Sequence, residues 1–508
     1  MQRLLAFFFA AALLWTPAWS QSAPDALVPD LSQYILTPPA PPTPRINGAK
    51  AFGARPGSEF LFAIPASGDR PMTFAAEGLP KGLSLDPSTG FITGRVKKPG
   101  TYLVKLTARN ALGEATRELR IVIGERIALT PPMGWNSWNC WARDVTQEQV
   151  LSSARAMVES GLVNHGWTYI NIDDGWQGRR GGRYNAIQTN DKFPDMKELS
   201  EQVHAMGLKL GIYSSPWIGT YAAHIGSYSD NPDGENQWIK DGNHNENFRY
   251  EKPGGNYWQD RKEMYRHGAY SFVEADARQW ADWQIDYLKY DWNPNDLYHV
   301  KEMHDALRAT DRDIVYSISN SAPYADAPLW VEYTDCWRTT GDIRDTWKSI
   351  SSIGFEQQRW APFCGPGHWP DADMLVVGLV GWGPKLHYTK LTADEQYTHM
   401  SLWAMLASPL LCSGAARYFH EIAAYQRRGD RRQPGSAGRA RRGDLGKGGT
   451  GDLRQAPRRR CDGRRVVQQN PRTREDRFHA QTTRHQGYAG RARPVETERP
   501  HDYRQGHS

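Results

Sequence analysis

The chain reads Ile285-Asp-Tyr-Leu-Lys-Tyr-Asp-Trp-Asn293 where a short strand is expected to end on a charged group. Aliphatic and aromatic residues are mixed with single charges here, as they are in short strands. Because side chains repeat every second residue along a strand, Lys289 and Asp291 project to the same side. Alone, the pair could be a surface salt bridge, so the case for a functional site depends on the other strand ends.

The sequence around this stretch alternates between strand and helix patterns. Thr146-Gln-Glu-Gln149 is a capping box that starts a helix, and a strand from Trp167 to Ile172 follows that helix. Strand-then-helix units of this kind repeat from residue 127 to residue 413, which predicts a parallel sheet. The number of repeats favours an α/β fold with a closed (β/α)8 TIM barrel, whose active site lies at the C-terminal strand ends.

Acidic residues gather at these predicted strand ends. The strand ends carry Asp173 and Asp174, Tyr213, Asp291, Ser319, the segment Arg338 to Asp342, and the segment Asp371 to Asp373. Several carboxylates at one rim repel each other unless they bind something. A neutral polyol that is hydrogen-bonded by carboxylates and stacked on Trp or Tyr fits this polarity and leaves two acids for chemistry. The 20 Trp and 23 Tyr residues point the same way, since sugar-binding clefts commonly use them.

A metal ion is the competing use of such an acidic cluster. No histidine joins the strand ends at ligand-like spacing, and the sequence contains no EF-hand loop. We therefore predict no metal and no cofactor at this rim. The five cysteines show neither a CxxC motif nor Cys/His metal spacing, and they specify no disulfide pair.

The N-terminus has the pattern of a cleaved secretory signal over residues 1–20. Arg3 precedes an apolar run from Leu4 to Leu14, and Ala18-Trp-Ser20 supplies a cleavage site. The apolar run is too short to span a bilayer. We therefore predict export to the periplasm or the extracellular space without membrane insertion, followed by a Pro-rich linker over residues 21–45.

Residues 46–124 predict a small β-sandwich. Apolar side chains from Tyr102 to Ala108 alternate on one face, and turn residues lie at Asp86–Gly90 and Asn110–Gly113. The stretch from Gly78 to Gly94 resembles the immunoglobulin-like modules that are attached to many secreted bacterial proteins. It contains no catalytic constellation, and a spacer or adhesion role is the preferred interpretation.

Between Gly226 and Tyr265 the alternation of strands and helices lapses. Gly, Asn, Asp and Glu dominate this segment around Trp238, Tyr250 and Trp258. We interpret it as an insertion on the upper side of the barrel, which either lines a cleft or forms a solvated decoration.

Six motifs occur between residues 127 and 412, spread over the predicted strands. They are Met133-Gly-Trp-Asn-Ser-Trp138, Tyr169-Ile-Asn-Ile-Asp-Asp-Gly-Trp176, Leu210-Gly-Ile-Tyr213, Asp286-Tyr-Leu-Lys-Tyr-Asp291, Trp337-Arg-Thr-Thr-Gly-Asp-Ile343 with Trp347, and Asp371-Ala-Asp-Met-Leu375. In this order they resemble glycoside hydrolase family 27, the α-galactosidase and α-N-acetylgalactosaminidase family. Each motif is weak by itself, whereas the set is specific.

The resemblance implies a retaining hydrolysis in two steps. Asp291 would attack the anomeric carbon as nucleophile, and Asp342 would protonate the leaving oxygen and later activate water. Lys289 would keep Asp291 ionised, whereas the acid needs a pKa high enough to hold a proton. The two carboxyl groups would lie about 5 to 5.5 Å apart. The sugar would be bound by Trp138, Asp173, Asp174, Tyr213, Lys289, Ser319, Ala322, Arg338 and Asp373.

The choice of sugar is left open at the strand that ends near Tyr316-Ser317. Family α-galactosidases commonly carry a Glu and a Leu after this strand, where this chain has Ser319 and Ala322. Small residues there resemble the relatives that accept a 2-acetamido group, but Asn320 departs from both patterns. We expect hydrolysis of terminal α-D-galactosyl residues from galactose-containing oligo- or polysaccharides. The alternatives are an α-N-acetylgalactosaminidase or a β-L-arabinopyranosidase.

A protein of another class is also compatible with the barrel. It would be a secreted, non-catalytic carbohydrate-binding protein on a degenerate hydrolase fold. The presence of both Asp291 and Asp342 favours the hydrolase, because a degenerate barrel has no reason to retain the pair. The sequence does not decide the oligomeric state.

The C-terminal tail, residues 414–508, carries the positive charge of the chain. It has 23 Lys plus Arg and 10 Asp plus Glu, which leaves residues 1–413 with a net charge of −7. The body therefore gives no electrostatic reason to expect nucleic acid.

The tail has no Trp and only eight Leu, Ile, Val, Met or Phe, too few to fill a core. We predict disorder or, as the preferred hypothesis, a frameshift in place of the C-terminal β-sandwich of the family. A basic tail that binds anionic polymers is the alternative.

Overall fold

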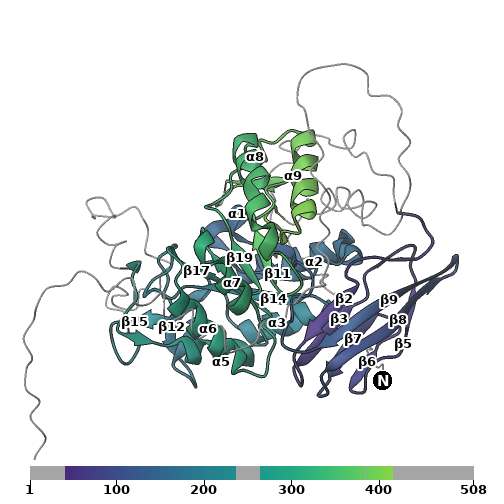
Figure 1. The fold of residues 1–508 in the computed structure, drawn as a ribbon, viewed down its shortest axis with the longest axis horizontal. Coiled ribbons are helices and arrows are strands. Elements are labelled where there is room, and N and C mark those ends of the chain that lie inside the picture. Colours follow the sequence, from purple (N-terminus) through teal and green to yellow (C-terminus); the bar gives the residue numbers. More distant parts are fainter. Residues whose placement is uncertain (1–39, 236–263, 384, 416–508) are drawn as a thin grey trace, which may run out of the picture. The chain divides into compact units, whose positions relative to one another are not determined.

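The computed structural model describes residues 40–235, 264–383 and 385–415, which all lie in one compact unit of the chain, Met1–Gly448 (Figure 1). The predicted signal, nearly all of the C-terminal tail and most of the predicted insertion lie outside the described residues. None of the described helices has the length and apolar character needed to cross a membrane.

Two small sheets form the N-terminal module. One has the strand order β2-β9-β8-β5 and the other β3-β7-β6. Val104, Leu106 and Ala108 of β8 are buried in one cluster with Phe60 and Ile92, as the alternation predicts, and the immunoglobulin-like β-sandwich is confirmed. The strands are β1 Arg45–Ile46, β2 Ala51–Ala54, β3 Glu59–Ala63, β4 Ala66–Ser67, β5 Thr73–Glu77, β6 Leu83–Leu85, β7 Phe91–Arg95, β8 Gly100–Asn110 and β9 Gly113–Ile123.

Eight parallel strands form the main sheet, in the order β20-β19-β18-β17-β14-β11-β10-β23. The first and last strands are joined through Leu375, whose N–H donates to the carbonyl of Leu411 (2.9 Å) and whose carbonyl accepts from the N–H of Ser413 (3.2 Å). The sheet therefore curls into the predicted barrel. Its strands are β10 Met133–Asn136, β11 Tyr169–Asn171, β14 Lys209–Ser214, β17 Tyr287–Asp291, β18 Val315–Ser319, β19 Cys336–Arg338, β20 Trp369–Asp371 and β23 Leu410–Cys412.

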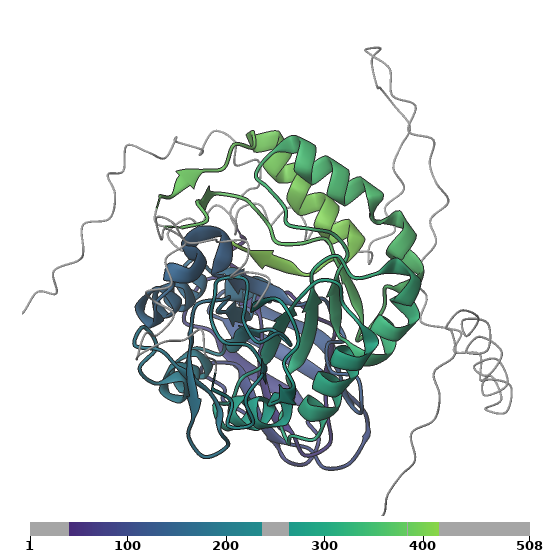
Figure 2. The ribbon, with the colours of Figure 1, turned by 90° about the vertical axis from the view of Figure 1, so that its left-hand side faces the viewer.

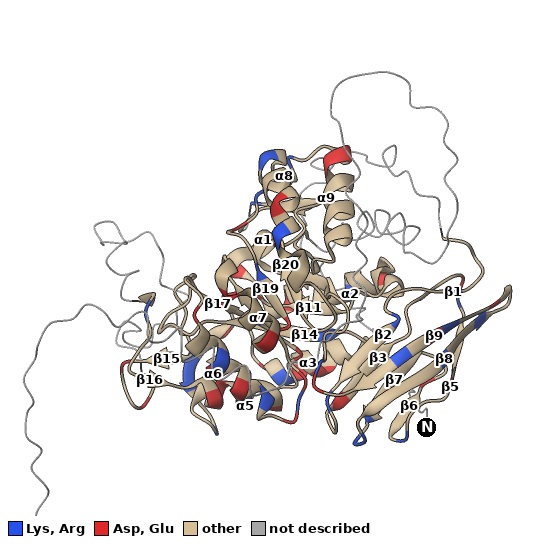
Figure 3. Ribbon diagram, viewed as in Figure 1, with Lys and Arg blue, Asp and Glu red and all other residues tan. Residues whose placement is uncertain are grey.

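Helices follow most of these strands and pack outside the sheet (Figures 1 and 2). The predicted capping box is present, since the N–H of Gln149 donates to Thr146 while the side chain of Gln149 accepts from the N–H of Thr146. Exposed ion pairs such as Lys301–Asp305 lie on the outer helices (Figure 3). The helices are α1 Trp138–Trp141, α2 Gln147–Glu159, α3 Met196–Ala205, α5 Val273–Asp282, α6 Leu297–Arg308, α7 Ala327–Tyr333, α8 Trp347–Phe355 and α9 Ala393–Leu406.

Among the described residues after Gly124, three pairs of short antiparallel strands lie outside the barrel sheet. They are β12 Gln177–Gly181 with β13 Ala186–Thr189, β15 Tyr228–Ser229 with β16 Tyr270–Ser271, and β21 Leu379–Val380 with β22 His387–Tyr388.

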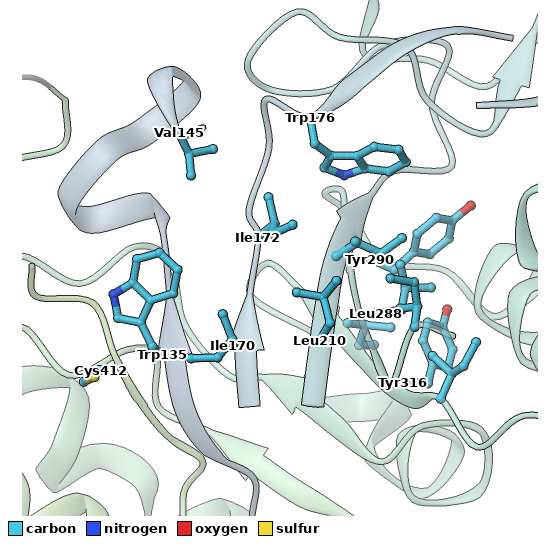
Figure 4. Packing of buried hydrophobic residues seen from close by; sticks show 14 of the residues in the cluster. Trp135, Val145, Ile170, Ile172, Trp176, Leu210, Leu288, Tyr290, Tyr316 and Cys412 are labelled. Carbon is cyan, nitrogen blue, oxygen red and sulfur yellow. The ribbon is translucent and has the colours of Figure 1, made fainter. Parts of the chain in front are cut away.

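Large side chains from several strands pack against the helices that surround the barrel. Trp135, Ile170, Leu210 and Leu288 come from four different strands, and each is fully buried (Figure 4). Burying one such side chain contributes about 1.5 to 3 kcal/mol relative to leaving it exposed. The core thus fixes the strands whose C-terminal ends carry the site.

Two motif glycines permit close approach between strands. A Cβ added to Gly134 would lie 2.1 Å from the carbonyl oxygen of Tyr169, and one added to Gly211 would lie 2.1 Å from Oδ1 of Asn171. Both distances are far inside van der Waals contact. The glycines in the Met-Gly-Trp and Leu-Gly-Ile-Tyr motifs are therefore required by strand packing.

The N-terminal module is joined to the barrel by a network of charged side chains around the buried Arg312 and Asp286. Nη2 of Arg312 bonds to Oδ1 of Asp286 (2.7 Å), and its Nη1 bonds to Oε2 of Glu59 in β3 (2.8 Å). Nε of Arg55 bonds to Oδ1 of Asp313 (2.7 Å). Burial opposes the charge on Asp286, but Arg312 and His204 hold the pKa of Asp286 well below its usual range.

Candidate active site

One cavity of about 520 Å³ lies at the C-terminal ends of the barrel strands. Nine of the eleven residues singled out in the sequence line it, namely Trp138, Asp173, Asp174, Tyr213, Lys289, Asp291, Arg338, Asp342 and Asp373. The other two, Ser319 and Ala322, are buried and are not among the residues that line the cavity. Asn320, between them, does line it.

Asp291 ends strand β17 and is 7% exposed. Its Oδ2 accepts a hydrogen bond from the hydroxyl of Tyr213 (3.2 Å), while its Oδ1 is buried without a hydrogen-bond partner among the described residues. Burial raises the pKa of Asp291 to about 6, although Lys289 and Arg338 both favour the charged form. One oxygen of this carboxylate is thus free of hydrogen bonds and poorly solvated, as suits a nucleophile.

Lys289 forms its ion pair with Asp173 rather than with Asp291. Its Nζ lies 2.8 Å from Oδ2 of Asp173, which also accepts from Nδ2 of Asn136 (2.8 Å). The sequence predicts that Lys289 keeps Asp291 ionised, and Lys289 acts in that direction although its direct ion pair is with Asp173. Lys289 does lower the pKa of Asp291, but the loss of solvent around that carboxylate outweighs it.

Arg338 ends strand β19 and bonds to three side chains at once. Its Nη2 lies 2.5 Å from Oδ1 of Asp342 and 2.8 Å from Oδ1 of Asn320, and its Nη1 lies 3.3 Å from Oδ1 of Asp373. Burial opposes the charge on Asp342, but Arg338 dominates and lowers the pKa of Asp342. The Asp342 side chain is 55% exposed, on the open side of the cavity.

The two carboxyl groups thus have the opposite pKa order from the one expected for a nucleophile and an acid. The reason is that Arg338 pairs with Asp342 and Lys289 pairs with Asp173, which leaves Asp291 with neither cation as a direct partner. Strand-end spacing places these groups at one rim but does not show which cation bonds to which acid.

Asp174 positions a loop as well as lining the cavity. Its Oδ1 accepts from the hydroxyl of Thr220 (2.8 Å), and its Oδ2 accepts from the N–H of Ala222 (2.7 Å). These bonds hold Tyr221 at the cavity wall. Tyr221 was not singled out in the sequence, because the segment around it has no periodic pattern.

Trp382 is a second cavity residue that the sequence pattern did not reveal. It lies between β21 and β22, and its only sequence signal is an aromatic residue flanked by Gly381 and Gly383. Asn139, Ala142, Arg143, Asp144, Ala222, Met374 and Gly383 complete the lining.

A group that could hold a metal lies elsewhere in the described residues. Ligand atoms of His267, Asp296 and His299 lie within 4.8 Å of one another. The Asp296 carboxylate is already bonded to the backbone N–H and Nδ1 of His299, as the N-cap of α6. None of the three residues lines the cavity.

Both parts of the chain resemble known proteins. Residues 130–242 and 258–426 match the family described as "Alpha galactosidase A", and residues 43–124 match the family described as "Putative Ig domain". Alpha-galactosidase 3 of Arabidopsis thaliana is 33% identical over 332 residues, covering 63% of this chain and 64% of its own length. Alpha-galactosidase A of Cellvibrio japonicus is 35% identical over 315 residues, covering 58% and 64%.

A solved structure also resembles this chain. The crystal structure of a putative alpha-galactosidase/melibiase from Bacteroides fragilis is 36% identical, with a TM-score of 0.62 over 76% of this chain and 79% of that one. The chain spans slightly less than two thirds of the length of the curated relatives it matches.

Proposed function

This chain belongs to the alpha-galactosidase A family, glycoside hydrolase family 27, and from that membership we propose that it is a retaining exo-glycosidase. It would remove terminal α-D-galactosyl residues from galactose-containing oligo- or polysaccharides. The observation that carries the proposal is the pairing of Asp291, whose Oδ1 has no hydrogen-bond partner among the described residues, with Asp342 in one cavity.

In the first step Oδ1 of Asp291 attacks the anomeric carbon and forms a glycosyl ester. Asp342 donates a proton to the glycosidic oxygen, and the leaving group departs as an alcohol. In the second step Asp342 takes a proton from water, the water oxygen attacks the anomeric carbon, and Asp291 is released as a carboxylate. The two steps invert the anomeric centre twice, so the configuration is retained.

The charges of the two carboxylates are linked to each other. While Asp291 is ionised, its negative charge disfavours charge on Asp342 and helps that group hold a proton for the first step. Ester formation removes the charge of Asp291, so Asp342 becomes more acidic and is ready to serve as base. Protonation of Asp342 also requires its bond with Arg338 to weaken, and a sugar hydroxyl that accepts from Arg338 would have this effect.

The remaining polar groups suit a neutral sugar. Asp173, Asp174 and Lys289 offer acceptors and a donor to hydroxyls, and Trp138 offers an aromatic face. α-Galactosidase stays ahead of α-N-acetylgalactosaminidase, because the curated relatives at 33% and 35% identity are named alpha-galactosidases. The N-terminal pattern supports export as part of the same proposal.

The test is a parallel assay of p-nitrophenyl α-galactoside, α-N-acetylgalactosaminide and β-L-arabinopyranoside with the purified chain. We expect the α-galactoside to have the highest kcat/KM. Binding of all three without turnover would overturn the hydrolase proposal in favour of a carbohydrate-binding protein, and a preference for another substrate would overturn the choice of sugar.

A further inference from the structure

The proposed mechanism leaves one part of the cavity without a role. The galactosyl residue is assigned to the charged groups around Asp291, but Tyr221 and Trp382 line the same cavity. A volume of about 520 Å³ lies in the range of sites that hold whole drug-sized ligands. The cavity therefore has aromatic wall area beyond that needed for the sugar that reacts.

Trp382 is held in an unusual backbone conformation. Its φ is +52°, in the left-handed region that bulky residues rarely adopt. Its N–H donates to the carbonyl of Asn139 (3.2 Å), and the N–H of Gly381 donates to the same carbonyl (2.8 Å). These bonds attach the β21–β22 hairpin to α1, which also carries Trp138. Such conformations persist where the surrounding structure enforces them, often at binding sites.

The same hairpin is bonded to the loop that carries the proposed acid. The guanidinium of Arg344 lies 5.5 Å from the centre of the Trp382 ring. Asp345 bonds through Oδ2 to Nε2 of His387 (3.0 Å) and to the N–H of Lys390 (3.2 Å). These contacts fix the hairpin that carries Trp382 against the loop that carries Asp342, which lies two residues before Arg344.

The position of the acid indicates where the leaving group lies. In the proposed first step Asp342 protonates the glycosidic oxygen, so the leaving group occupies the side of the cavity next to Asp342. Trp382 lines the cavity on a hairpin fixed to that side, and Arg143 and Asp144 add polar groups to the lining. A pyranose ring, with an apolar C–H face and polar edges, fits an aromatic wall with charged neighbours better than an apolar chain does.

We propose that Trp382 forms a binding subsite for the leaving group, and that this subsite takes a hexopyranosyl residue. The inference rests on the proposed galactosidase function and adds a preference for galactosides whose aglycone is itself a sugar. Trp382 would stack on the aglycone ring and hold its glycosidic oxygen near Asp342, without touching the galactosyl residue.

The test compares two substrates that share the galactosyl group. Melibiose has a sugar leaving group, whereas α-D-galactosyl fluoride has a leaving group too small to reach Trp382. We expect Trp382→Ala to lower kcat/KM for melibiose about tenfold and to change that for the fluoride less than about twofold. Trp382→Phe should recover part of the loss, because it retains an aromatic face.

Trp347 offers a matched control, since it is an exposed tryptophan (40%) at the start of α8 that does not line the cavity. Trp347→Ala should leave kcat/KM unchanged for both substrates. The subsite proposal would be overturned if Trp382→Ala lowered kcat/KM equally for melibiose and the fluoride. It would also be overturned if the substitution left both values unchanged. A wild-type protein that cleaves neither substrate would overturn the galactosidase proposal itself.

Discussion

Asp291 combines a buried position with an oxygen that has no hydrogen-bond partner among the described residues. A nucleophile needs both features, because hydrogen bonds and water lower the reactivity of a carboxylate. We predict that Asp291→Ala lowers kcat by several orders of magnitude while the protein stays folded, since only the group that forms the ester is lost. Steady-state kinetics and circular dichroism check this outcome. Activity near that of the wild type would exclude Asp291 as nucleophile.

The pKa of Asp291 predicts a pH dependence. Burial raises the pKa of this carboxyl to about 6, and only the ionised form can attack. With α-D-galactosyl fluoride, which needs no acid, kcat/KM should therefore rise with pH and level off above about pH 6. A pH profile with melibiose, run beside one with α-D-galactosyl fluoride, tests the assignment, because the fluoride needs no acid but needs the same nucleophile. A rising limb seen with melibiose alone would contradict it.

The same pKa predicts a gain in stability when the charge is removed. The folded pKa of Asp291 is above its ordinary value of 3.8, so its contribution to the free energy of unfolding falls as pH rises from about 4 to about 6. Asp291→Asn should remove this fall and stabilise the protein by about 2 to 3 kcal/mol above pH 6.

Urea unfolding at several pH values measures this difference. The exposed Asp311→Asn serves as the control and should show no such trend. A variant Asp291→Asn that is less stable than the wild type at pH 7 would show that the ionised carboxylate is stabilised by its surroundings.

At the scale of single elements, the motif glycines are set by strand packing. Gly134 in β10 faces the carbonyl oxygen of Tyr169, which cannot move without breaking the ladder of β11. Gly134→Ala should therefore destabilise the protein by about 1 to 3 kcal/mol or more. Gly124 follows β9, and an added Cβ there meets nothing within 4 Å, so Gly124→Ala should change stability by less than about 0.5 kcal/mol. Equal unfolding midpoints in urea would refute the packing argument.

Strand ends were the most informative elements in the sequence. Period-2 and helical patterns predict the order of β11, α3, β14, α5 and β17, because each element has to bury one face. The parallel ladder then brings residues such as Asp173 and Asp342 to one rim, although they are far apart in the chain.

These patterns do not predict the conformations of loops or the partners of ion pairs. Tyr221 and Trp382 lie in segments whose conformation depends on tertiary hydrogen bonds to Asp174 and Asn139. The partners of Arg338 likewise follow from rotamers that packing selects. For this reason the sequence identified the acids of the site but not the order of their pKa values.

At the scale of the whole described unit, the immunoglobulin-like module shares a charge network with the barrel. Arg312 bonds to Asp286 at the start of the β17 segment and to Glu59 of the module. Arg312→Ala removes a cation that bonds to the buried Asp286, and it should lower the free energy of unfolding by about 3 to 5 kcal/mol. Lys105→Ala removes an exposed ion pair with Glu77 and should cost about 1 kcal/mol or less. Thermal unfolding of both variants compares them, and similar losses would refute a structural role for the network.

The charge distribution of the whole chain agrees with a neutral substrate. Residues 1–413 carry a net charge of −7, and the cavity pairs its acids with Lys289 and Arg338. That the basic tail arises from a frameshift stays a prediction. Translating the other reading frames of the encoding DNA tests it. A frame that continues with alternating apolar residues after Ser413 would support it, and the lack of any such frame would refute it.

Covalent trapping tests most directly whether Asp291 forms an ester with the galactosyl residue. Incubation with 5-fluoro-α-D-galactosyl fluoride should trap that ester, because the added fluorine slows its hydrolysis. Mass spectrometry of the digested protein should then find the fluorogalactosyl group on the peptide that contains Asp291, and Asp291→Asn should carry none. A label on another carboxylate, or hydrolysis of melibiose by the wild-type protein with no trapped ester, would exclude Asp291 as the nucleophile.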